Sequence, residues 1–294
     1  MIEQVQQVNF DRGKHPGMEF EILTLENILY RKDMDHNQLN THQISFYVLM
    51  VITDGHGRHT IDFEDYPYKK GSVLTIRKDQ IHSFHAGKAN GYVLLFTEEF
   101  VLSYMEQTGS QKIKEVFNEL LFRQATDLSA QDYEEMSVVL EQIDSEFNQY
   151  ADVHSSSIIR NLLQVLVSKL HRIRNTSSQL NLDHKYIPQF FGFQKLVEQH
   201  CTESRSVTYY ADQLGLTTKT LNNITQKIID KAPKAFIDEI LVLKIKRELI
   251  NSHLSVKEIA YRSGFGEPTN LFKFFKRYTG YTPESFRTRY SREF

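Results

Sequence analysis

The spacing of hydrophobic residues divides the chain into a strand-rich N-terminal part and a helical remainder. Between residues 19 and 96, short runs of Val, Ile, Leu, Phe and Tyr alternate with turn signals such as the Asp-Gly-His-Gly sequence at 54–57. These runs predict strands at 20–29, 44–52, 57–63, 72–76 and 92–96. Short strands at close, regular spacing indicate a small antiparallel barrel or jelly roll.

From residue 98 onward the period changes to that of a helix, with apolar residues three or four positions apart. Two stripes stand out, at 133–147 and at 158–170. The second stripe is so wide that it has two explanations. Either this helix covers the barrel on one side and a second subunit on the other, or it lies inside one core. On the first explanation we expect a homodimer formed through this helical segment.

The stretch 174–185, RNTSSQLNLDHK, is polar and follows neither period, so it predicts a domain boundary. We therefore expect a sensing and dimerisation domain at 1–173, a linker at 174–185 and an all-α domain at 186–294. The fold class is α+β multidomain. A flexible coil of this length would span roughly 20 Å.

The stretch 254–287 predicts two short helices separated by a tight turn and followed by a sharp stop. Ser255 and Glu258 have the S-x-x-E spacing of a capping box at the start of the first helix. Gly264 can take the positive φ that the turn needs, and Gly280 ends the second helix. This is the pattern of a helix-turn-helix, whose second helix presents its outer face.

The same pattern occurs once earlier, at 206–233, and a long helix predicted at 234–251 joins the two units. Two such units on a rigid spacer can read adjacent major-groove segments about 34 Å apart. The outward faces carry amides, hydroxyls and cations, which suit base edges and phosphates. These faces hold Lys219, Asn222, Asn223 and Gln226 in the first unit, and Thr269, Asn270, Lys273 and Lys276 in the second.

The distribution of charge supports a nucleic-acid partner for the C-terminal part only. The whole chain has a net charge of −2. From Asp183 onward it holds 18 Lys and Arg against 12 Asp and Glu, a net charge of +6, and the remainder carries −8. A basic C-terminal third behind an acidic body indicates polyanion binding by one domain, with double-stranded DNA as the expected partner.

Histidines in the strand-rich part suggest an alternative function, a metal-dependent enzyme of the cupin type with an accessory helical domain. The segment 71–82 resembles the second cupin motif in spacing, but Arg77 and Asp79 replace its usual proline and glycine. His42 and His82 are the two candidate ligands, and a catalytic metal needs three protein donors.

We therefore predict no bound metal, no cofactor and no catalytic residue. His56 and His59 stand in or beside a predicted turn, and their side chains are expected to face solvent.

The C-terminal part resembles the AraC/XylS family of transcription regulators. The sequences that carry the resemblance are SVKEIAYRSGFGEP, LFKFFKRYTGYTP and ESFR, and the earlier unit, SVTYYADQLGLTTKTL, is a looser match. In the N-terminal part, HQISFYVLMVITDGHG and GSVLTIRKDQIHSF resemble that family's cupin-like sensing domain. One departure is Asp230, which stands where the family usually has glycine after the first recognition helix.

The resemblance implies a cytoplasmic, often dimeric DNA-binding regulator whose barrel binds a small effector or a dimer partner, with RNA polymerase as a further partner. Carried over by position, base contacts fall on Lys219, Asn222 and Asn223 in the first unit. In the second unit they fall on Pro268, Thr269, Asn270 and Lys273. Neither the effector nor the operator follows from the sequence.

The remaining sequence features fit a soluble protein of a reducing compartment. Cys201 is the single cysteine, which excludes an internal disulfide. No signal peptide is apparent at the N-terminus, and the longest apolar run, 46–52, is too short to cross a bilayer. We expect a cytoplasmic location without membrane contact.

Overall fold

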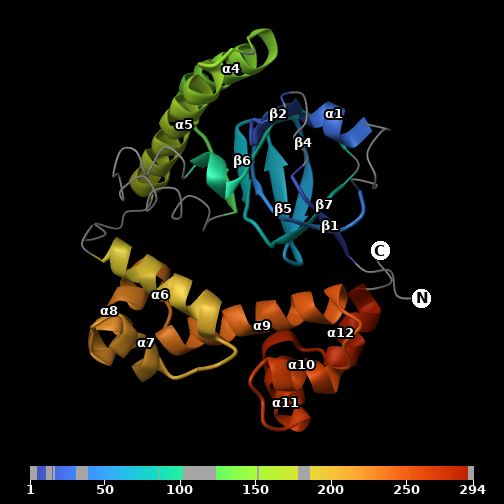
Figure 1. Ribbon diagram of the computed structural model, residues 1–294, viewed down its shortest axis with the longest axis vertical. Helices are drawn as coiled ribbons and strands as arrows, with labels where there is room; N and C mark the ends of the chain where they lie inside the picture. Colours follow the sequence, from blue (N-terminus) through green and yellow to red (C-terminus); the bar gives the residue numbers. More distant parts are fainter. Residues whose placement is uncertain are drawn as a thin grey trace. The chain divides into compact units, whose positions relative to one another are not determined.

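The computed structural model describes residues 5–10, 15, 17–30, 39–85, 87–101, 124–150, 152–177 and 186–290 (Figure 1). The chain divides into two compact units, one within Gln6–Gln179 and one chiefly within Leu180–Phe294. The α+β multidomain class is confirmed, with the sheet in the first unit and helices alone in the described part of the second.

Among the described residues of the first unit, nine strands form one sheet, mostly antiparallel. They are β1 (Gln6–Val8), β2 (Phe20–Thr24), β3 (His42–Ile44), β4 (Tyr47–Ile61), β5 (Glu64–Lys69), β6 (Ser72–Ile76), β7 (Ile81–Phe84), β8 (Lys88–Phe96) and β9 (Ala125–Asp127). The long strand β4 pairs with β6 and β8 along its first half and with β5 and β7 along its second. The sheet therefore curls around β4, which confirms the predicted small antiparallel barrel (Figure 1).

Three of the predicted strands were wrong in detail, because 20–29 ends early and 44–52 and 57–63 are parts of one strand. Residues after Thr24 leave the sheet and form helix α1 (Leu25–Tyr30), whose Leu25 and Ile28 are buried under it. The predicted turn at 54–57 instead lies inside β4, where the pairing with β8 shifts between Ile52 and Asp54. Gly55 there has φ +79°, and an added Cβ would collide with the backbone of β8. Gly55 therefore marks a β-bulge at which two backbones approach closely. The sequence pattern of such a bulge resembles that of a turn.

Two hydrophobic cores lie on opposite faces of the curled sheet. One face packs against α4 (Ala130–Gln149) and α5 (Ser155–Ser177), which form an antiparallel pair, and the other packs against α1. The helical stripe predicted at 133–147 is confirmed by α4, whose buried residues are Met136, Val139, Leu140, Ile143 and Phe147. The helix expected from residue 98 begins there, and its continuation at 102–123 lies outside the described residues.

The predicted linker begins too early. Helix α5 continues to Ser177, and Arg174 is buried, with its Nε donating to Thr126 Oγ1 of β9 at 2.5 Å. An arginine that is anchored to the sheet belongs to the first unit, although its sequence neighbours are polar. The rest of the predicted linker, 178–185, lies outside the described residues.

The second unit confirms the tandem helix-turn-helix domain. Its helices are α6 (Ile187–His200), α7 (Val207–Gln213), α8 (Thr218–Ile229), α9 (Pro233–Asn251), α10 (Val256–Arg262), α11 (Pro268–Thr279) and α12 (Pro283–Tyr290). Helix α9 contacts α6 and α8 of the first helix-turn-helix unit and α10, α11 and α12 of the second. It buries apolar side chains along most of its length, as a spacer between two cores requires.

Candidate nucleic-acid interface and sensing domain

The first helix of each unit starts at a capping side chain. Ser206 accepts a hydrogen bond from the amide of Tyr209 at the start of α7. At the start of α10, the Ser255 amide donates to Glu258 Oε2 at 2.7 Å, and the Glu258 amide donates to Ser255 Oγ at 3.2 Å. The predicted capping box is thus present. Hydrogen bonds from the Ser255 hydroxyl and then from the Ser255 amide to the Glu258 carboxylate hold the pKa of that carboxyl below its usual value.

The turns and ends of the units use left-handed backbone where the sequence offers glycine or aspartate. Gly215 and Gly264 have φ values of +64° and +78° in the two turns. Gly280 ends α11 at φ +77°, and Asp230 ends α8 at φ +52°. Asp230 therefore takes the same conformation as the glycine that it replaces, and its carboxylate accepts a hydrogen bond from the side chain of Gln226. This departure from the family sequence leaves the geometry of the helix end intact.

Helices α8 and α11 expose the predicted DNA-binding residues together on one face each. Lys219, Asn222, Asn223 and Gln226 are exposed on α8, and Thr269, Asn270, Lys273 and Lys276 are exposed on α11, with Pro268 half-buried at its first turn. The opposite faces are core: Leu221 and Ile224 in α8, and Leu271 and Phe275 in α11, are fully buried. Each helix therefore packs on the core with one face and exposes the opposite face, which is accessible to a groove of DNA.

Two polar contacts of the second unit were not found from the sequence. Tyr278 fits the apolar stripe of α11, yet it is exposed and its hydroxyl donates to Asp238 Oδ2 of α9 at 2.8 Å. Asp238 is buried, and its Oδ1 also accepts a hydrogen bond from Lys234 Nζ at 2.6 Å. Burial, and then the hydrogen bond to Asp238, raise the pKa of Tyr278. This pair connects the spacer helix to the second recognition helix.

The other contact joins the last helix to the spacer. Arg287 Nε donates to the carbonyl of Leu249 near the end of α9, and its Nη2 donates to the carbonyl of Leu254 before α10, both at 2.7 Å. One guanidinium thus satisfies two carbonyls at the point where the chain leaves α9 for the second unit. Neither Asp238 nor Arg287 follows from hydrophobic periodicity, because both partners are distant in sequence.

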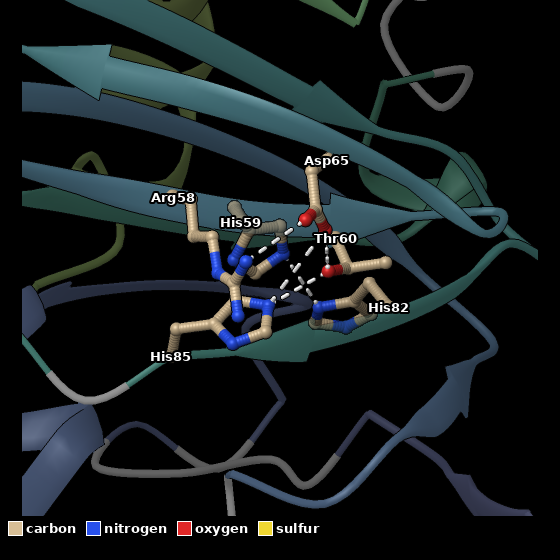
Figure 2. Close-up of polar contacts among 6 residues, drawn as sticks. All are labelled: Arg58, His59, Thr60, Asp65, His82 and His85. Carbon is tan, nitrogen blue, oxygen red and sulfur yellow. Dashed lines mark hydrogen bonds and ion pairs between the residues drawn. The ribbon is translucent and has the colours of Figure 1, made fainter. Parts of the chain in front are cut away.

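The histidines of the sensing domain come together inside the curled sheet (Figure 2). His59 Nε2 and His82 Nδ1 are 3.0 Å apart, and His42 faces His82 across paired strands with ring centroids 4.1 Å apart. The prediction that His59 faces solvent was wrong: it lies on β4, its side chain is fully buried, and its Nδ1 has no hydrogen-bond partner among the described residues. His56 is exposed, as expected, although it lies on the strand and not in a turn.

Burial, followed by the charges of His42 and His85, lowers the pKa of His59 to about 3. The outer face of the same strands carries a separate network, in which Thr60 Oγ1 contacts Asp65 Oδ1 at 2.5 Å and His85 Nε2 at 2.7 Å (Figure 2). His42 and His82, the two candidate ligands, are thus neighbours. In the part of the chain that the structure describes, no three His, Cys, Asp or Glu side chains are grouped so that they could hold a metal ion.

Family models match both units of the chain. Residues 28–163 match the AraC-like ligand binding domain, and residues 210–289 match a helix-turn-helix domain model. The chain belongs to the AraC family of transcription regulators. It is a DNA-binding regulator with an effector-binding N-terminal domain, and its two matched segments correspond to the curled sheet with its helices and to the tandem helical units.

Curated relatives and solved structures resemble the chain over most of its length. The HTH-type transcriptional activator RhaS of Escherichia coli O81 is 23% identical over 259 residues, covering 84% of this chain and 86% of RhaS. RhaS of E. coli O1:K1 is 22% identical with the same coverage. Among solved structures, ToxT from Vibrio cholerae is 15% identical, covers 92% of this chain and 98% of its own, and has a TM-score of 0.44. These relatives are transcription regulators and not enzymes.

No helix among the described residues combines the length and the apolar character that a membrane span needs.

Proposed function

We propose that this regulator binds its operator by inserting α8 and α11 into two major-groove segments on one side of the duplex. The observation that carries the proposal is the pairing of two recognition helices on one spacer, each with its amide, hydroxyl and cationic side chains exposed. Bidentate amides suit adenine, and lysines suit guanine or phosphate. Base contacts are assigned to Lys219, Asn222, Asn223, Pro268, Thr269, Asn270 and Lys273, with Lys276 on phosphate and Gln226 partly held by Asp230.

The test uses the full-length protein and a duplex selected by it from a random library. We expect affinity for the selected duplex at least about a thousandfold above that for random duplex, with both affinities falling as salt rises. Equal affinity for the two duplexes would contradict sequence-specific readout. A helical domain that serves only protein contacts would show no salt-dependent DNA binding at all.

We also propose that the chain dimerises through α4 and α5. Helix α5 buries Ile159, Leu163, Leu166, Val167 and Leu170 against the sheet and α4, as the internal-core explanation of its wide apolar stripe requires. Ile158 and Val165 remain exposed on the other side, and Val138 is exposed on α4. An ion pair between Lys169 and Glu135 at 2.8 Å places the two helices side by side, with Val165 and Val138 each one helical turn away from it. These valines form an apolar strip that fits a second copy of the same strip.

The effector is assigned to the inner face of the curled sheet, which carries the buried histidines together with the second hydrophobic core. Binding there would act on DNA through the dimer, with RNA polymerase as a further partner. Titration of the full-length protein with a library of small metabolites, read as a rise in melting temperature, tests the assignment. A stabilising compound whose effect survives replacement of His59 and His82 would place the site elsewhere.

A further inference from the structure

The two helix-turn-helix units touch each other directly, in addition to packing on the shared helix α9. The loop 201–206 connects α6 to α7 in the first unit, and it lies against the turn between α10 and α11 in the second. Any side chain at Gly264 would collide with the carbonyl oxygen of Thr202, because the two backbones are in contact there. Glycine is therefore required at position 264 for two reasons: the positive φ of the backbone and this close approach.

Arg205 crosses the same junction with its side chain. Its guanidinium carbon lies 4.5 Å from the ring centroid of Phe265 and 5.5 Å from that of Phe274. Phe265 is in the turn of the second unit and Phe274 is on α11, and they are only 3% and 7% exposed. A cation of the first unit is thus stacked on two rings that the core of the second unit holds in place.

The loop is fixed equally well within its own unit. Tyr210 is fully buried in α7, and its hydroxyl donates to the carbonyl of Ser204 at 2.7 Å. The amides of Glu203 and Ser204 both donate to the carbonyl of His200 at 2.9 Å. Because the loop is anchored to the end of α6 and to α7, it cannot move against the second unit without displacing the first.

Two connections constrain the recognition helices more tightly than one. If the two units were joined by the spacer helix alone, they could rotate and bend about its ends. A second contact between the units restricts this relative motion. The distance and rotation between α8 and α11 are therefore set jointly by α9 and by the junction of loop 201–206 with Gly264, Phe265 and Phe274. One inserted base pair displaces a groove segment by about 3.4 Å and rotates it by about 34°.

We propose that loop 201–206, with Arg205 as its positioning residue, sets the spacing between the two DNA segments that this protein recognises. Arg205 acts through Phe265 and Phe274 and makes no contact with DNA. The inference rests on the proposed reading of DNA by both recognition helices.

The experiment measures how the full-length protein tolerates changes in spacing. The probe is the duplex that the wild type selects, together with versions carrying one or two base pairs inserted or deleted between its two recognised segments. For the wild type, each change lowers affinity. In Arg205→Ala, we expect the ratio of affinities between the original and altered spacings to shrink by about threefold to tenfold, with an unchanged salt slope.

Two further variants make the result specific. Lys195→Ala removes an exposed charge from α6 of the same unit without touching the junction, and it should keep the wild-type spacing ratio. Arg205→Met keeps the packing of the alkyl stem while it removes the cation, and it should reduce the ratio even if Arg205→Ala folds poorly.

Three outcomes would overturn the proposal. Equal loss of affinity at every spacing, with a salt slope lower by about one, would make Arg205 a phosphate contact. A lower melting temperature with an unchanged spacing ratio in both Arg205 variants would make it a structural residue only. A wild type that tolerates inserted base pairs freely would exclude a fixed spacing. Failure of the wild type to prefer any duplex would instead contradict the proposed function itself.

Discussion

At the scale of single residues, the proposed function assigns Asn223 and Lys273 to base contacts and Lys276 to a phosphate contact. Asn223 on α8 and Lys273 on α11 are exposed near the middle of their helices, whereas Lys276 lies one turn closer to the end of α11. An amide or amine in the groove distinguishes one base pair from another, whereas a lysine on phosphate has the same effect on every sequence. The two classes therefore respond differently to replacement.

We expect Asn223→Ala and Lys273→Ala each to weaken binding to the selected duplex by about 1–3 kcal/mol and to relax preference at one base pair. Lys276→Ala should weaken binding to all sequences alike and reduce the salt slope by about 1. Competition binding against single-base variants of the duplex, repeated at several salt concentrations, separates these results. Uniform losses for all three variants would show that none reads bases.

At the scale of elements, much of the fold could be predicted because its signals are local. The capping box of α10, the turn glycines and the apolar face of α11 are each encoded within a few residues. Pairings between segments that are distant in the sequence could not be predicted. Tyr278 with Asp238, and Thr202 with Gly264, are brought together only by the folded chain, and no local pattern in the sequence indicates either pairing. His59 was misread for a related reason: the bulge in β4 resembles a turn, and a turn would have exposed it.

Tyr278→Phe tests the connection between α9 and α11. It removes one hydrogen-bond donor from Asp238, a buried carboxylate whose other described side-chain donor is Lys234. We expect the free energy of unfolding of the C-terminal unit to fall by about 1–3 kcal/mol, measured by urea denaturation. Tyr261→Phe, at an exposed tyrosine of α10, is the matched control and should change stability little.

Val165→Glu tests the proposed dimer strip on α5. In a symmetric interface, the introduced carboxylate would be buried near its own copy and without a cationic partner. Association should therefore weaken by at least about tenfold. Sedimentation velocity over a range of protein concentrations measures the change. Val153→Glu is a suitable control, because Val153 is 89% exposed and lies before α5 begins. A monomeric wild type, or equal effects of both variants, would contradict the strip as the interface.

At the scale of the whole molecule, the two units should respond differently to acid. The folded pKa of His59 is about 3, against 6.5 for an ordinary histidine. As pH falls below 6.5, the unfolded chain binds a proton that the folded sheet excludes, so stability is lost progressively down to about pH 3. The loss is at most about 1.4 kcal/mol per pH unit. His42, His82 and His85 face or flank His59.

We therefore expect the melting temperature of the N-terminal unit to fall between pH 6.5 and 5, with less effect on the C-terminal unit. Calorimetry of the full chain resolves the two transitions if they differ. His59→Gln should flatten the pH dependence of the first transition, while His56→Gln, on the exposed side of the same strand, should leave it unchanged. Identical acid sensitivity in His59→Gln and the wild type would exclude His59 as the cause.

Strand β4 has a consequence for how a signal crosses the N-terminal unit. Its side chains alternate, so Val48, Met50 and Ile52 enter the inner core while Leu49 and Val51 enter the core that α4 and α5 share. A molecule bound inside the sheet would thus be separated from the helices outside it by the backbone of one strand. A shift of that backbone displaces side chains in both cores at once, and transmission needs no chain of intermediate residues. If the effector and the second copy bind where we propose, the alternation of side chains along this one strand couples the two sites.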